Sequence, residues 1–158
     1  MNLSLRAANN SDQEFAFLVK RAALGSYVEQ VWGWNDDFQR RFHASDWTSH
    51  RPDIITCDAE AIGTLEVVRH SDHLYVGAFY LLPAWQRRGV GSRLLQDVVE
   101  RGFRERLPIR LQFLKINPVR SLYERHGFRI TGETLTHFLA ECPRSDSTAP
   151  IARAFDIT

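Results

Sequence analysis

The sequence predicts a single domain of the α/β class, built on a mixed, mostly antiparallel sheet. Residues 53–82 contain three runs rich in β-branched and aromatic residues, separated only by the short turns "DAE" and "HSD", which is the pattern of an antiparallel meander. Segments with helical periodicity lie before and after these runs. A chain of 158 residues can bury one sizeable core, so we expect one domain over residues 1–142 and a polar, partly disordered tail over residues 143–158.

The elements before the meander are predicted by their capping signals. Residues 3–8 form a short first strand. Ser11 followed by Glu14 has the spacing of a capping box and opens a helix through residues 15–24. Asn35 is a typical N-cap residue and opens a second helix. The predicted order is therefore strand, helix, helix, and then the three strands of the meander.

After the meander, segments with helical periodicity alternate with segments that have the composition of strands. Residues 92–107 place leucine, valine and phenylalanine on one helical stripe, and Pro108 ends that helix. Residues 109–114 form a strand, residues 117–127 a helix that ends at its glycine, and residues 136–142 the last strand. The complete order is strand, two helices, three strands, helix, strand, helix and two strands.

Composition limits the classes of protein that remain. Lysine and arginine number 20 against 19 acidic residues, so no global field favours nucleic acid as a partner. The two cysteines, Cys57 and Cys142, lack the spacing of a zinc site or a disulfide scaffold. No apolar run reaches the length of a membrane span, and the N-terminus lacks the apolar core of a signal peptide. We expect a cytoplasmic protein that binds neither metal, membrane nor nucleic acid.

The stretch "QRRGVG", residues 86–91, lies between the last strand of the meander and a long helix. A helix N-terminus carries unpaired amides and a partial positive charge, and the missing Cβ atoms of Gly89 and Gly91 let an anion approach those amides closely. A nucleoside-triphosphate loop is disfavoured because no lysine stands in this turn, and a dinucleotide turn is disfavoured because Leu94 stands where the third glycine is needed. The turn predicts a phosphate site of another kind.

Two segments of the chain carry a resemblance to a known family. "QRRGVG" resembles the Q/R-x-x-G-x-G/A acetyl-CoA signature of the GNAT superfamily of N-acetyltransferases. "NPVRSLYERHGF", residues 117–128, resembles the family's second recurring segment, in which an asparagine, a tyrosine and a terminal Gly-Phe recur. The predicted order of elements also matches the family fold over residues 3–142. The resemblance implies a sheet that is splayed between its fourth and fifth strands.

The resemblance implies acetyl-CoA as the co-substrate and assigns residues that hold it. Amides of the signature turn bind the pyrophosphate of coenzyme A, which assigns Arg87, Arg88, Gly89, Val90, Gly91 and Ser92. A bulge in the fourth strand lets the pantetheine arm pair with the strand backbone, which assigns Phe79, Tyr80, Leu81 and Leu82. For the side chains of these strand residues an ordinary core role is the alternative. For the two arginines a simply solvated role is the alternative.

Two further residues are assigned by the second segment. Asn117 matches the residue that contacts the pantetheine arm, and its alternative role is to cap a helix whose first position is Pro118. Tyr123 matches the tyrosine that protonates the leaving coenzyme A thiolate, and its alternative role is a buried aromatic. The reaction implied is direct attack of a neutral amine on the thioester carbonyl. A backbone N–H at the strand bulge can hold the oxyanion that forms.

The base and the amine acceptor are less determined. A base or a chain of water molecules must take the proton of the amine. Where some family members keep a catalytic glutamate, this chain has Tyr75 or an immediate neighbour, which leaves Glu66, Glu29 and His73 as candidate bases. For each of the three an exposed surface role is the alternative. In this fold the segment between the first two helices forms one wall of the acceptor cleft. Aromatic faces beside carboxylates suit a cationic amine, whether a small molecule or a peptide. The acceptor candidates are Tyr27, Glu29, Trp32 and Trp34. We expect only one of the two tryptophans to line the cleft, the alternative being that both fill the core.

A second class of function stays open. Because fold does not determine function, the domain can also be a non-catalytic acyl-CoA sensor or an interaction module that keeps the cofactor site without turnover. A binding protein would not need a tyrosine at the leaving thiol. A homodimer is common among similar proteins, but the sequence does not indicate the oligomeric state.

Overall fold

The computed structural model describes residues 1–144 and contains every predicted helix and strand in the predicted order. The strands are β1 (Leu3–Ala7), β2 (Asp53–Cys57), β3 (Glu60–Arg69), β4 (Leu74–Leu81), β5 (Ile109–Leu114), β6 (Arg129–Glu133) and β7 (His137–Cys142). The α-helices are α1 (Gln13–Trp32), α2 (Asp36–Trp47), α3 (Val90–Glu105) and α4 (Arg120–Arg125). Two short 3-10 turns, η1 (Asn10–Asp12) and η2 (Pro83–Trp85), precede α1 and α3. The tail prediction for residues 145–158 lies outside the described residues.

The strands form one seven-stranded sheet in the order β1-β2-β3-β4-β5-β7-β6. The pairs β1–β2, β2–β3, β5–β7 and β6–β7 are antiparallel, whereas β4 and β5 are parallel. The parallel pairs join Leu74 to Ile109 and Tyr75 to Arg110, at the start of both strands, and β4 then continues to Leu81. The predicted mixed, mostly antiparallel sheet is therefore confirmed.

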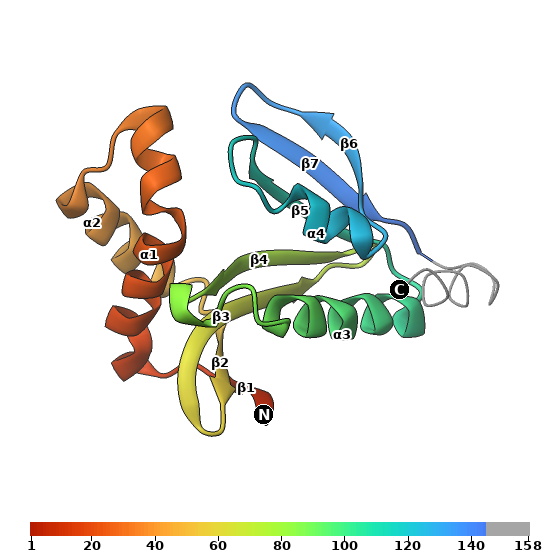
Figure 1. Cartoon of the computed structure of the whole chain (residues 1–158), viewed down its shortest axis with the longest axis horizontal. Coiled ribbons are helices and arrows are strands. Elements are labelled where there is room, and N and C mark those ends of the chain that lie inside the picture. Colours follow the sequence, from red (N-terminus) through yellow and green to blue (C-terminus); the bar gives the residue numbers. More distant parts are fainter. Residues whose placement is uncertain (145–158) are drawn as a thin grey trace. The chain divides into compact units, whose positions relative to one another are not determined.

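The chain divides into two compact units. The first unit contains residues 1–66 and 77–90, and the second contains residues 67–76 and the described part of the chain from residue 91 onward. In the first unit α1 and α2 form a helical hairpin (Figure 1). In the second unit α4 packs on β5, with the ring of Tyr123 5.4 Å from that of Phe113.

The start of α1 corrects one capping prediction and the start of α2 confirms another. The expected box of Ser11 and Glu14 is wrong, because the Oδ1 of Asn9 accepts from the Ser11 amide and the Oδ2 of Asp12 accepts from the Asn9 amide, each at 2.9 Å. Asp12 also binds the guanidinium of Arg6 through both carboxylate oxygens, which holds the box two residues earlier. The cap by Asn35 is confirmed, since its side chain accepts from the Phe38 amide at 2.9 Å.

The second unit follows the predicted periodicity but shortens its small helix. The apolar stripe of α3 is buried at Leu94, Leu95, Val98 and Val99. The expected cap by Asn117 ahead of Pro118 is wrong, because residues 115–119 form turns and α4 begins only at Arg120 with Val119 as its N-cap. These turns include a bond from the Asn117 amide to the Leu114 carbonyl at 2.9 Å.

Candidate active site

Strand β4 departs from regular strand geometry at Ala78, which has a φ of +45°. For an alanine the left-handed region costs about 1–2 kcal/mol, so the surroundings must hold this conformation. The hydroxyl of Thr64 on β3 donates to the Ala78 carbonyl at 2.7 Å, and Thr64 is only 1% exposed. Ala78 stands one residue before the four strand residues assigned to the pantetheine arm.

The end of β4 is tied to the turn that follows it. Tyr80, Leu81 and Leu82 are half-buried. The Leu82 amide donates to the Ile62 carbonyl on β3 at 2.9 Å, and the Gln86 side-chain amide donates to the Leu81 carbonyl at 3.0 Å. Sequence reasoning gave Gln86 no role beyond the signature, yet its side chain closes the loop from β4 to the start of α3.

The signature turn places two residues in the left-handed region before α3 begins. Arg87 has a φ of +61° and Gly89 a φ of +81°. A Cβ at Gly89 would meet no atom within 4 Å, so within the protein it is the backbone angle that favours glycine there. Both arginines are exposed, and the Arg88 guanidinium lies 4.4 Å from the centre of the Trp85 ring. The turn leads into the N-terminus of a 16-residue helix, which is electrostatically suited to an anion.

In the second unit Ser92 has a partner that sequence reasoning missed. Its hydroxyl lies 2.8 Å from the Nε2 of His126, the C-cap residue of α4. Burial lowers the pKa of His126, and the charge of the neighbouring Arg125 lowers it further, so the neutral imidazole is favoured. The two residues are 34 positions apart, so no local pattern could have joined them. The bond links the start of α3 to the end of α4.

Tyr123 is enclosed by aromatic side chains. It is 9% exposed, and its ring lies 5.4 Å from that of Phe113 and 5.7 Å from that of Phe128. Burial raises the pKa of Tyr123 to about 12, so the phenol keeps its proton at neutral pH. The main-chain carbonyl of Tyr123 accepts from the amides of His126 and Phe128. The structure therefore brings Tyr123 together with the Ser92–His126 pair through α4.

The acceptor candidates lie on the hairpin of α1 and α2 and differ in their surroundings. The Glu29 carboxylate accepts from the Trp34 amide, and its main-chain carbonyl accepts from the Gly33 amide at 3.0 Å. Glu29 therefore holds the turn between the helices. Tyr27 is half-buried, whereas Trp32 is 59% exposed.

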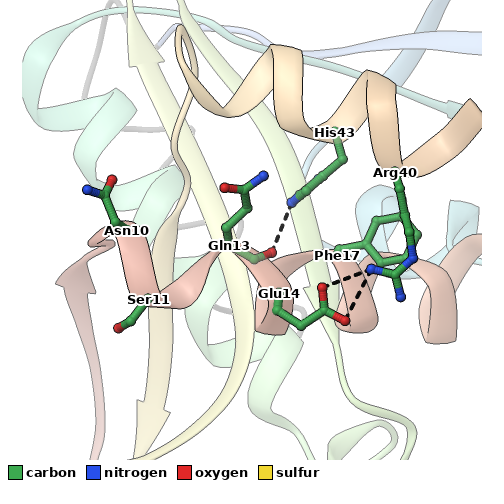
Figure 2. A pocket seen from close by; sticks show the side chains of 7 residues that line it. All are labelled: Asn10, Ser11, Gln13, Glu14, Phe17, Arg40 and His43. Atoms are coloured by element: carbon green, nitrogen blue, oxygen red, sulfur yellow. Dashed lines mark hydrogen bonds and ion pairs between the residues drawn. The ribbon is translucent and has the colours of Figure 1, made fainter. Parts of the chain in front are cut away.

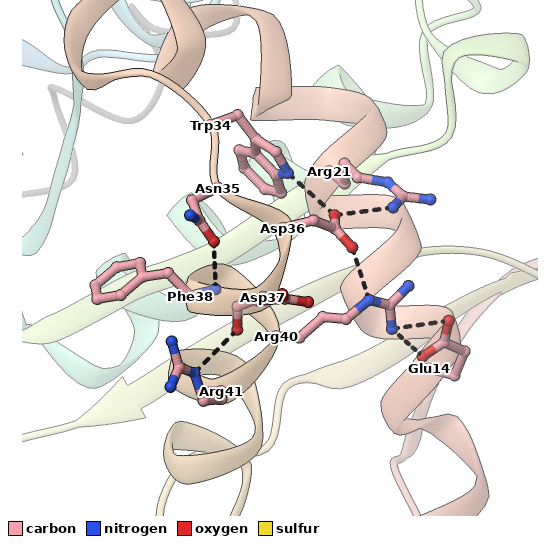
Figure 3. A network of polar contacts seen from close by, with 9 residues as sticks. All are labelled: Glu14, Arg21, Trp34, Asn35, Asp36, Asp37, Phe38, Arg40 and Arg41. Atoms are coloured by element: carbon pink, nitrogen blue, oxygen red, sulfur yellow. Dashed lines mark hydrogen bonds and ion pairs between the residues drawn. The ribbon is translucent and has the colours of Figure 1, made fainter.

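Trp34 belongs to a polar network centred on Asp36, shown in Figure 3. The Asp36 carboxylate accepts from the Trp34 indole at 3.1 Å, from Arg21 at 3.0 Å and from Arg40 at 2.9 Å. These three hydrogen bonds lower the pKa of Asp36 to about 2, and the bond from the Trp34 indole has the largest effect. Arg40 also binds both oxygens of Glu14. The network crosslinks the two helices.

A polar cavity of about 360 Å³ lies in the first unit, and Figure 2 shows the residues around it. It is lined by Asn10, Ser11, Gln13, Glu14, Phe17, Arg40 and His43. Its charged groups are already paired within the protein: Arg40 binds Glu14, and the Nε2 of His43 lies 3.1 Å from the Gln13 carbonyl. No residue predicted from the sequence for cofactor or acceptor lines this cavity.

The candidate bases have different environments. Burial raises the pKa of Glu66, and the Nδ1 of His50 lies 4.0 Å from its carboxylate. The Nδ1 of His73 lies 2.8 Å from the carboxylate of Asp72 and its ring stacks on that of His70. Glu66 belongs to the first unit and His73 to the second. Within residues 1–144 no group of three or more histidine, cysteine or acidic side chains is arranged to hold a metal ion, and no helix is long and apolar enough to cross a membrane.

The seven-stranded sheet, the irregular fourth strand and the glycine turn before a long helix define an acetyltransferase fold. The profile of the Acetyltransferase (GNAT) family matches residues 18–128, and the chain belongs to this family. Membership of this family establishes the general class of activity, acetyl transfer. No curated protein matches the chain by sequence.

Solved structures of low sequence identity share the fold. The PaiA N-acetyltransferase from Thermoplasma acidophilum, determined in complex with coenzyme A, is 17% identical with a TM-score of 0.71, over 92% of this chain and 100% of that one. The ribosomal-protein-S18-alanine N-acetyltransferase from Escherichia coli is 15% identical with a TM-score of 0.66, over 92% and 96% of the two chains. An acetyltransferase from Thermus thermophilus is 16% identical with a TM-score of 0.70, over 90% and 97%.

Proposed function

We propose that the protein is an acetyl-CoA-dependent N-acetyltransferase that moves an acetyl group to a primary amine by direct attack in a ternary complex. Family membership and the coenzyme A complex of the Thermoplasma acidophilum structure support the donor. The observation that carries the proposal is the turn with left-handed Arg87 and Gly89 at the N-terminus of α3. Successive amides in such a turn, together with the helix dipole, suit the pyrophosphate of coenzyme A.

The chain's own residues supply the chemistry of transfer. A base takes one proton from the ammonium group, and the neutral nitrogen attacks the thioester carbon to form a C–N bond. The oxyanion then collapses and the C–S bond breaks, while the thiolate takes the proton of the Tyr123 phenol. The proton lost by the new amide nitrogen passes through solvent to the tyrosinate and restores the phenol. Burial raises the pKa of Tyr123 to about 12, so the phenol carries its proton throughout the neutral range and has it available for the leaving thiolate. The Phe79 N–H, next to the left-handed Ala78, is the proposed donor to the oxyanion.

The remaining groups are assigned by their surroundings. Glu66 is the preferred base, because burial raises its pKa and the nearest charged partner, the Nδ1 of His50, lies as far as 4.0 Å from its carboxylate, whereas the Glu29 carboxylate already accepts a hydrogen bond from the Trp34 amide. Trp32 is the preferred aromatic contact for a cationic amine, because it is exposed, whereas the indole of Trp34 donates to Asp36. The acceptor class is a small-molecule or peptide amine.

The experiment is an amine panel with acetyl-CoA, read by thiol release and by mass spectrometry of the product. With the acceptor found, Tyr123→Phe should lower turnover by about 100- to 1,000-fold and leave the dissociation constant for acetyl-CoA within about twofold. Equal turnover by Tyr123→Phe refutes the acid role. Binding of acetyl-CoA without thiol release on any amine favours the acyl-CoA sensor instead.

A further inference from the structure

Two adjacent residues of β3, Gly63 and Thr64, shape the irregular part of β4. The Thr64 hydroxyl donates to the Ala78 carbonyl at 2.7 Å, and Ala78 is the residue with the positive φ. At Gly63 the backbone of β4 passes so close that an added Cβ would overlap the Tyr80 carbonyl oxygen and stand 3.2 Å from the Leu81 Cα. All of these residues belong to the first unit.

The hydroxyl of Thr64 is well placed to fix a backbone conformation. The residue is 1% exposed, so its hydroxyl cannot exchange its partner for water without opening the strand pair. A threonine side chain has few accessible rotamers in a strand, so the direction of its hydrogen bond is restricted. Left-handed backbone at an alanine persists only where the surrounding structure holds it. The bond to Ala78 is therefore a restraint on the β4 backbone as well as the partner of a buried polar group.

The restraint determines where the next amide points. The carbonyl of Ala78 and the N–H of Phe79 belong to one planar trans peptide unit, in which the C=O and N–H bonds point in opposite directions. With the carbonyl directed at Thr64, the Phe79 N–H is directed away from Thr64. We propose that Thr64 is a positioning residue that aims the Phe79 amide at the thioester carbonyl. This inference rests on the proposed function, because that function assigns the Phe79 N–H to the oxyanion.

The test compares Thr64→Val, which keeps the shape and removes the hydroxyl, with Thr64→Ser, which keeps the hydroxyl. Thr64→Val should lower kcat by about 10- to 100-fold, because the amide loses its preorganised direction, and leave the KM for acetyl-CoA within about twofold. Thr64→Ser should retain kcat within about threefold of the wild type. A Thr64→Val variant with the wild-type kcat overturns the proposal.

Thr56→Val is the matched control for loss of a buried threonine hydroxyl. Thr56 is 6% exposed, and its hydroxyl bonds that of Ser4 at 2.7 Å, on β2 and β1 rather than on β4. This variant should lose thermal stability and keep its kcat. An equal loss of kcat in Thr56→Val and Thr64→Val would show that both act through general destabilisation, and would overturn the positioning role.

Two further measurements keep the inference falsifiable. If Thr64→Val is too unstable to assay, the double variant Thr64→Val with Ala78→Gly is compared with Ala78→Gly alone, because glycine adopts a positive φ without steric penalty. The same loss of kcat is expected. The NMR shift of the Phe79 amide should also differ between the wild type and Thr64→Val, and an unchanged shift refutes the restraint. A wild type that transfers acetyl to no amine refutes the proposed function, while the amide shift still tests Thr64.

Discussion

A single methyl group at Gly63 is expected to displace the end of β4. An added Cβ would overlap the Tyr80 carbonyl oxygen and crowd the Leu81 Cα at 3.2 Å, and both are backbone atoms that cannot rotate away. The strand must move by roughly 1 Å to restore ordinary contact, and misplacement of that size costs about 100-fold in rate where it reaches reacting groups. Gly63→Ala should therefore lower turnover by about 100-fold and destabilise the fold by about 1–3 kcal/mol.

The assay pairs urea unfolding with acetyl-CoA turnover, and Gly25→Ala is the matched control. Gly25 lies inside α1, and an added Cβ there would meet only the Arg21 Cγ, at an ordinary 3.6 Å. Because alanine favours the helix interior over glycine, Gly25→Ala should stabilise the protein by about 0.5–1 kcal/mol. Opposite signs for the two Gly→Ala changes are the expected result. A Gly63→Ala variant with wild-type stability and turnover would refute the argument that close strand contact holds β4.

Three further predictions concern the helical hairpin. Asp36→Asn should lower the melting temperature at pH 7. The difference from the wild type should disappear as the pH falls from 3.8 to about 2, because the depressed pKa of Asp36 stabilises the fold only while the carboxylate is ionised. Asp37→Asn, in the same helical turn, should have little effect. Burial lowers the pKa of His43 in the folded chain, so the unfolded chain binds the proton more readily and the free energy of unfolding should fall as the pH drops below 6.5. In urea unfolding between pH 7 and 5, His43→Gln should flatten the dependence of that free energy on pH. An unchanged dependence would contradict the assignment. Trp32→Ala should raise the KM for the acceptor by about two- to fivefold and leave acetyl-CoA binding unchanged, whereas Trp34→Ala should lower the melting temperature. The reverse pattern would assign acceptor contact to Trp34 and a structural role to Trp32.

The order of helices and strands was predictable because it depends on local periodicity. The β-branched and aromatic runs of β2, β3 and β4 and the apolar stripe of α3 are properties of neighbouring residues. The errors arose where a distant partner competed with a local signal. The capping box lies at Asn9 and Asp12, on the 3-10 turn η1 that precedes α1, and Asp12 also binds Arg6 on β1. The spacing of Ser11 and Glu14 cannot reveal that contact.

The donor side of the candidate site was predictable in part. The signature turn was recognisable from its glycines, whereas the positive φ of Arg87 and Gly89 is visible only in the structure, and the assignment of the turn to the donor stays a prediction. The supporting residues were missed, because Thr64 and His126 act on Ala78 and Ser92 from strands and helices distant in sequence. A threonine in a strand-like run is indistinguishable from any other strand residue until the partner of its hydroxyl is known.

The hydrogen bond between Ser92 and His126 makes the start of α3 and the end of α4 thermodynamically linked. In the proposed donor site, a phosphate that hydrogen-bonds the Ser92 hydroxyl changes the environment of the bond between Ser92 and the His126 imidazole at 2.8 Å. The His126 amide in turn donates to the main-chain carbonyl of Tyr123. Because coupling is reciprocal, the proposal predicts that a substitution that loosens the last turn of α4 changes donor affinity, and that donor binding protects that turn from hydrogen exchange.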